Sequence, residues 1–105
     1  MVSDTDIAVI GLAGRFPGAA DVEQFWRNLA VGVESIRFFS REELQNAGIA
    51  NELLLKPNYV RANGVLEGVD LFAAEFFEIS ARESELMDPQ HRLFLECAWE
   101  TMEMA

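Results

Sequence analysis

The 105-residue chain has one cysteine, one histidine and only 8 basic residues against 18 acidic ones. The formal net charge of −10 argues against nucleic acid or an anionic membrane as principal partner, because both would repel the chain. No stretch approaches the roughly 20 apolar residues that span a bilayer. The acidic start MVSDTD also lacks the positive charge and apolar run of a secretory signal. We therefore expect a cytoplasmic protein.

The scarcity of reactive side chains predicts no catalytic residue and no metal site. Cys97 cannot form an internal disulfide, and it lies in an apolar helix without a cationic neighbour, which is typical of an inert, packed thiol. His91 has Asp88 three residues before it but no second ligand at the next helical turn. Glu83 and Glu85 cluster near Asp88, but as a helix surface and a helix cap rather than an acid–base pair.

A glycine-rich turn follows the first apolar run and could suggest a phosphate cradle. However, the spacing of Gly11, Gly14 and Gly18 does not match a nucleotide motif, and no Lys followed by Ser or Thr is present. Asp21 would also place a negative charge where the anion should bind. We therefore predict no cofactor-binding residue here, and a turn that lets a strand and a helix pack.

The elements themselves indicate an α/β fold. Residues 6–12, DIAVIGL, form a short β-branched run typical of a buried, parallel-type strand. A helix is predicted after Asp21, whose capping box with Gln24 opens it and whose end is marked by Gly32. Strand, turn and helix in this order favour an α/β architecture.

Further along, local signals predict several shorter elements. Residues 36–38 form a brief strand, Ser40 caps a helix that runs toward Gly48, and residues 49–58 form a surface excursion. Residues 59–69 are extended, and their Asn-Gly pair leaves open whether a tight hairpin forms within them. The large aromatic side chains of residues 71–77 need cover, and a further capping box opens a helix through Leu86.

The last predicted helix, in MDPQHRLFLECAWE, carries more apolar surface than a small chain can shelter. Asp88 caps it and Pro89 occupies its first position. Its charged residues fall on one narrow stripe, which we expect to face water, while the rest of the circumference is apolar. That stripe consists of Arg92, Glu96, Glu100 and Glu103. Such a helix belongs inside a larger domain or a subunit interface.

Three segments together, IAVIGLAGRFPG, PNYVRANGVLEGVDLFAAEFFEIS and MDPQHRLFLECAWE, resemble the opening of the ketosynthase domain of modular polyketide synthases. The resemblance covers about residues 6–103 and implies a partial thiolase-like fold, with residues 1–105 as one N-terminal portion and no second domain. It implies a parent acyltransferase that performs decarboxylative Claisen condensation of acyl and malonyl-type thioesters. In that family a Cys and two His residues carry the reaction, and all three lie after residue 105.

The resemblance also sets expectations for partners. The parent uses phosphopantetheine-linked substrates on an acyl carrier protein and forms a homodimer, whereas this chain alone is expected to bind no cofactor and to be inactive. The alternative is a free-standing small interaction protein with a ketosynthase-like front that binds a synthase partner. A stop codon directly after Ala105 would favour that alternative. Glu78 stands where the family usually has Gly, so we expect either a strained backbone or a local change of structure there.

Overall fold

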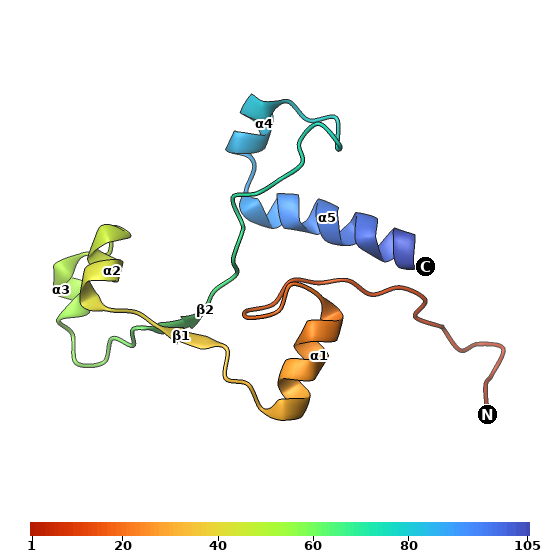
Figure 1. Ribbon diagram of the computed structural model, residues 1–105, viewed down its shortest axis with the longest axis horizontal. Helices are drawn as coiled ribbons and strands as arrows, with labels where there is room; N and C mark the ends of the chain where they lie inside the picture. Colours follow the sequence, from red (N-terminus) through yellow and green to blue (C-terminus); the bar gives the residue numbers. More distant parts are fainter.

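The computed structural model describes all residues 1–105, which form five helices and one two-stranded antiparallel sheet (Figure 1). The molecule is elongated and flat, with extents of 58 × 41 × 23 Å. The elements in chain order are α1 (Val22–Val31), β1 (Ile36–Phe38), α2 (Arg41–Asn46), α3 (Asn51–Leu54), β2 (Ala62–Gly64), α4 (Ala81–Leu86) and α5 (Pro89–Met104).

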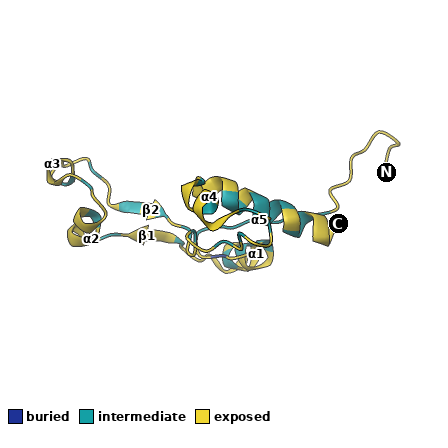
Figure 2. Ribbon diagram, turned by 90° about the horizontal axis from the view of Figure 1, so that it is seen from above, coloured by how far each residue is buried: buried dark blue, intermediate teal, exposed yellow.

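These elements do not enclose a hydrophobic core. Ala19, at 6% exposure, is the one buried residue, and every helix and strand has exposed surface (Figure 2). The chain exposes 8779 Å², whereas a compact monomer of 11.8 kDa exposes about 5,900 Å². Its radius of gyration is 18.6 Å, against about 13 Å for a compact domain of this length. The expected α/β composition is present, but the elements lie spread out.

The predicted strand at residues 6–12 does not form. No backbone hydrogen bond joins residues 7–11 to any other main-chain group, and Ile7, Val9 and Ile10 are exposed. Figure 1 shows this segment trailing beside the end of α5. The β-branched residues of this segment favour an extended backbone. A strand also needs a neighbouring strand to pair with its backbone groups, and this chain places none beside the segment.

Helix α1 begins and ends where its capping residues predict. The Asp21 carboxylate accepts a hydrogen bond from the Gln24 backbone N–H at 2.7 Å. The Gln24 side chain instead donates to Asn28, so only half of the predicted capping box forms. Gly32 ends the helix with a φ of 71°, a left-handed conformation that glycine adopts without a Cβ clash.

A two-stranded ribbon leads from α1 to the small helices α2 and α3 (Figure 1). The ribbon pairs β1 with β2, so that Arg37 lies opposite Asn63. The hairpin considered within residues 59–69 is therefore absent, because Asn63 and the glycine after it lie inside β2 rather than at a turn. At the far end of the ribbon, Ser40 and Glu43 complete the predicted capping box of α2.

The corner between α4 and α5 is built from local caps and one long side chain. The Ser80 hydroxyl accepts from the Glu83 backbone N–H at 3.2 Å, and the Asp88 carboxylate accepts from the Gln90 N–H at 2.8 Å, after which Pro89 opens α5. The bond from the Glu83 N–H to the Ser80 hydroxyl is the half of the predicted capping box that forms at Ser80. Arg92 donates to the carbonyls of Ser84 and Val69, both at 3.0 Å, and so ties α5 to the corner and to the preceding loop.

Candidate functional site

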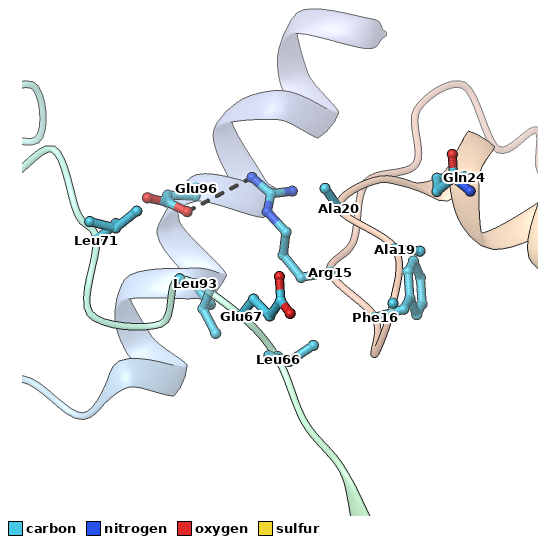
Figure 3. Close-up of a pocket in the computed structure, with 12 residues that line it drawn as sticks. Arg15, Phe16, Ala19, Ala20, Gln24, Leu66, Glu67, Leu71, Leu93 and Glu96 are labelled. Carbon is cyan, nitrogen blue, oxygen red and sulfur yellow. Dashed lines mark ion pairs between the residues drawn. The ribbon is translucent and has the colours of Figure 1, made fainter. Parts of the chain in front are cut away.

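The main long-range polar contact joins the glycine-rich turn to α5. Both terminal nitrogens of Arg15 donate to the carboxylate of Glu100, one of them at 2.8 Å, in a two-point fork. Arg15 also lies 3.8 Å from a carboxylate oxygen of Glu96, the pair drawn in Figure 3. These side chains are 24% to 41% exposed, so the contact is partly shielded from water. A fork of this kind fixes orientation as well as distance.

The ion pair shifts both partners toward their charged forms. The hydrogen bond from Arg15 is the main reason that the pKa of Glu100 lies below its ordinary value. The hydrogen bond to Glu100 likewise raises the pKa of Arg15. Since both groups are charged at neutral pH, the clamp between the turn and α5 is fully formed there.

The backbone of the turn also approaches α5 closely. A Cβ added to Gly11 would lie 2.5 Å from the backbone carbonyl oxygen of Thr101, a distance that no side chain could occupy. The Leu12 N–H points to the sulfur of Met104 at 3.3 Å. The glycine turn thus serves packing, as expected, although the element packed against Gly11 is α5 rather than the helix that follows the turn.

An open hollow of about 710 Å³ lies between the turn, α5 and the loop before residue 72 (Figure 3). Arg15 and Glu96 line its polar wall, and Phe16, Leu66 and Leu93 contribute apolar surface. A carboxylate from the loop, Glu67, also borders the hollow. The lining contains no nucleophile and no histidine, so we assign it no chemistry.

The charged stripe of α5 is arranged differently from the prediction. Of the four residues expected to face water, Glu103 does so, but Arg92, Glu96 and Glu100, which we name the inner stripe, are partly buried against the chain itself. Phe94 and Met102 lie on the opposite side and are 71% and 75% exposed. Together with Ala98, at spacings of four residues, they form an apolar outer stripe. The inner stripe finds its polar partners within the chain. Arg15 pairs with Glu96 and Glu100, and Arg92 donates to one carbonyl of α4 and one of the preceding loop.

Aromatic side chains before α4 give α5 part of its apolar cover. The ring of Phe76 meets Trp99 edge to face at 4.7 Å and meets Phe77 at 5.0 Å, while Phe72 and Phe77 stack at 5.2 Å. The turn that carries them places Glu78 at a φ of +56°, as the sequence led us to expect for a position where the family has Gly. Phe76 and Trp99 still remain about half exposed.

The residues considered as sites from sequence are not brought together. Cys97 is half buried in the middle of α5, and His91 is exposed in its first turn. Glu83 and Glu85 are exposed on α4, and Asp88 serves as a cap. No group of three or more metal-ligating side chains is positioned to hold an ion. None of the helices combines the length and apolarity needed to cross a bilayer.

Sequence reasoning missed Arg15. The signal was present: three acidic side chains at regular spacing on an otherwise apolar helix leave a negative stripe with one cation, Arg92, at its start. What the sequence did not show is that a cation 85 residues earlier would meet that stripe.

The family description "Beta-ketoacyl synthase, N-terminal domain" matches residues 4–105. The chain belongs to this family. It is 49% identical over 104 residues to one of the phenolphthiocerol/phthiocerol polyketide synthase proteins of Mycobacterium tuberculosis, a match that covers 99% of the chain and 7% of that protein. It is 46% identical over 102 residues to the polyketide synthase PksN of Bacillus subtilis, with 97% of the chain and 2% of that protein covered.

Solved structures agree with this assignment. Ketosynthase twelve of the bacillaene polyketide synthase from Bacillus amyloliquefaciens superposes with a TM-score of 0.78 and 47% identity, covering 91% of the chain and 17% of that structure. The oxazolomycin ketosynthase domain from Streptomyces albus JA3453 gives 0.76 and 34%. The chain therefore corresponds to the N-terminal part of a polyketide synthase ketosynthase with a thiolase-like fold, and it spans less than a fifth of the solved domains.

Proposed function

We propose that these residues form the opening part of a polyketide synthase domain that performs decarboxylative Claisen condensation. In that reaction an acyl group moves from a carrier protein's phosphopantetheine thiol to a cysteine thiolate, with cleavage of one thioester and formation of another. A malonyl-type extender then loses carbon dioxide, and its carbanion attacks the enzyme thioester. The new carbon–carbon bond forms as the carbon–sulfur bond breaks and frees the cysteine.

The residues described here contribute structure to this reaction rather than reacting groups. The nucleophile and the histidines that stabilise developing negative charge would come from the rest of the domain. Arg15, Glu100 and Gly11 hold the glycine turn against α5. We further propose a cytoplasmic location, an acyl carrier protein as partner of the whole enzyme, and a homodimeric parent.

One observation carries the proposal: the apolar outer stripe of α5 faces solvent, while Glu100 and both terminal nitrogens of Arg92 in the inner stripe have hydrogen-bond partners within the chain. A helix with this polarity is half of a packing interface, since large apolar side chains at 71% and 75% exposure gain stability only when covered. Within the family that the chain belongs to, the remainder of the ketosynthase is the cover.

A hybrid domain tests the proposal. Residues 1–105 would replace the matching part of ketosynthase twelve from Bacillus amyloliquefaciens, giving a hybrid ketosynthase whose condensation of carrier-bound thioesters is compared with that of the unaltered domain. We expect a rate within about tenfold of the parent, which corresponds to a loss below about 1.4 kcal/mol of transition-state stabilisation. A folded hybrid that takes up the acyl group but never forms the carbon–carbon bond would refute the proposal.

A free-standing interaction protein is the second candidate, because Arg15 and Glu100 join the glycine turn to α5 within the chain itself. It would be favoured if the hybrid were inactive while the 105-residue chain bound an intact synthase. The condensing role and the binding role are therefore separated by the same pair of measurements.

A further inference from the structure

The ribbon formed by β1 and β2 has two faces of opposite character. Residues that lie opposite each other in an antiparallel pair share a face, and each strand alternates between the two faces. The register pairs Arg37 with Asn63, and the Phe39 N–H donates to the Arg61 carbonyl at 2.8 Å, so these four residues lie on one face. In agreement, the Arg37 guanidinium lies 5.0 Å from the centroid of the Phe39 ring. We name this the polar face of the ribbon.

The opposite face of the ribbon is apolar. By the same alternation it carries Phe38 and Val60, which are 76% and 74% exposed. Any apolar cover takes this face, because a dry contact over the polar face would bury the Arg61 guanidinium without a counter-charge. The polar face is therefore the one that stays in contact with water.

The polar face presents unpaired hydrogen-bond donors. Arg37 donates to Glu43 at 2.9 Å, whereas Arg61 is exposed and forms no ion pair within the chain. The Asn63 side-chain oxygen accepts from the Gly64 N–H at 2.9 Å, which fixes the amide and leaves its NH₂ group free to donate. A free guanidinium and a free amide, two residues apart on one strand face, suit a ligand that carries hydrogen-bond acceptors and negative charge.

The charge around the ribbon favours an acidic protein segment as that ligand. Residues 53–66 hold Lys56 and Arg61 and no acid, in a chain whose formal net charge is −10. Repulsion from the rest of the chain directs an acidic partner to this region. The three-residue strands span only about 10 Å, which matches a short segment. A membrane or a nucleic acid would extend over the acidic remainder and be repelled.

We propose that the polar face of the ribbon docks an acidic segment of a partner protein, with Arg61 and Asn63 as the principal donors. One carboxylate of the segment accepts from the Arg61 guanidinium at two points, and a neighbouring acceptor binds the Asn63 amide. This inference goes beyond the proposed function, because it assigns the ribbon a protein contact that takes no part in condensation.

The test is the binding of a fluorescein-labelled decaglutamate peptide to the hybrid ketosynthase that carries residues 1–105, followed by fluorescence anisotropy. We expect binding that weakens as salt is added. Arg61→Ala should weaken it about threefold to fivefold, the upper range for one exposed charge pair. Asn63→Arg adds a cation to the same face and should strengthen it by a similar factor. The matched control is Arg82→Ala, which removes an exposed cation of α4 that also lacks an ion pair and should leave binding unchanged.

The side chains of the test and control positions are exposed, so circular dichroism of the hybrid should not change between variants. Equal losses in Arg61→Ala and Arg82→Ala, or no gain in Asn63→Arg, would overturn the inference. So would tighter binding of phosphatidylserine vesicles or of a ten-phosphate DNA strand than of the peptide. A folded hybrid that binds the peptide through Arg61 but forms no carbon–carbon bond counts against the proposed function and spares this inference. An active hybrid that ignores the peptide does the reverse.

Discussion

The inner and outer stripes of α5 differ in every respect that matters for folding. The inner stripe is charged, partly buried and paired: Arg15 holds Glu100, and Arg92 reaches two carbonyls. The outer stripe is apolar and open, with Phe94 and Met102 at 71% and 75% exposure. A helix in a self-sufficient domain shows the reverse arrangement.

The contrast teaches which contacts this chain makes for itself. Polar and close-backbone contacts are mostly made within the chain, because Arg15 of the glycine turn supplies a fork and Gly11 leaves room for the Thr101 carbonyl; the Arg92 Nε is the one buried side-chain donor left without a partner. Apolar burial, the dominant favourable term in folding, is almost wholly missing. Polar contacts rather than apolar burial therefore hold α5 in place within this chain.

The largest expected effect concerns the outer surface of the isolated chain. We predict that residues 1–105 alone bind a hydrophobic dye and self-associate with rising concentration, because their apolar patches exceed those of ordinary monomers. Dye fluorescence and analytical ultracentrifugation measure the two effects. A monomer that melts sharply and binds no dye at high concentration would contradict this prediction, because it would show that the outer stripe is not exposed in solution.

The next effect concerns the inner side. Gly11→Ala should destabilise the hybrid ketosynthase by about 1–3 kcal/mol, the usual cost of overpacking. The added methyl would lie 2.5 Å from the Thr101 carbonyl oxygen, and a backbone atom cannot move aside as a flexible side chain can. Thermal denaturation measures the loss. Gly48→Ala is not a fair control because its φ is 91°, so an exposed Ala30→Gly change in α1 gives the scale of a helix-propensity effect instead.

Features set by residues close together in the sequence were predicted better than features that depend on distant segments. The caps at Asp21, Ser40 and Asp88 and the glycine stop at position 32 involve neighbours within four residues, and all are present. The strand at residues 6–12 and the hairpin left open at residues 59–69 both depend on which segments pair with one another. The predicted strand is absent, and β2 pairs with β1 instead of forming a hairpin within residues 59–69.

The candidate site shows the same limit. The sequence showed a charged stripe and an apolar remainder on α5. Which of them faces the chain depends on Arg15, which lies 85 residues before its partner Glu100. Composition marked that helix as unsheltered, and the structure bears this out. The family resemblance, confirmed by the match over residues 4–105, supplied what periodicity could not.

A substitution in the turn that carries Phe76 should raise the stability of the hybrid rather than lower it. Glu78 adopts a φ of +56°, a left-handed conformation that costs a non-glycine residue about 1 kcal/mol. Glu78→Gly should therefore stabilise the hybrid by up to about 1 kcal/mol and firm the placement of Phe76 on Trp99. Thermal denaturation together with tryptophan fluorescence checks both. A melting temperature that falls would show that the Glu78 side chain contributes more than its backbone costs.

The Arg15 clamp should have a smaller effect than the close backbone contact. Arg15→Ala removes the fork and leaves Glu96 and Glu100 facing each other, for a loss of about 1 kcal/mol in this partly exposed setting. Arg15→Lys keeps the charge but not the two-point geometry, so it should restore only part of the loss. The matched control is Arg27→Ala, whose pair with Glu23 on α1 is far more exposed and should contribute little. Equal losses at both positions would mean that the inner stripe is no better shielded than the open surface.

Acid should undo the same clamp with the smallest effect of the series. Because the pKa of Glu100 is held below its ordinary value by the hydrogen bond from Arg15, the carboxylate stabilises the folded state above the unfolded pKa of about 4.5, and this contribution is lost as pH falls through the lower folded value. Arg15 stays cationic throughout and adds no pH dependence of its own. The stability gap between the hybrid and its Glu100→Gln variant, below about 1 kcal/mol at pH 7, should therefore close on acidification below pH 4.5. A gap that stays constant to pH 3 would show that Glu100 acts through its shape and not its charge, since Gln preserves the first and removes the second.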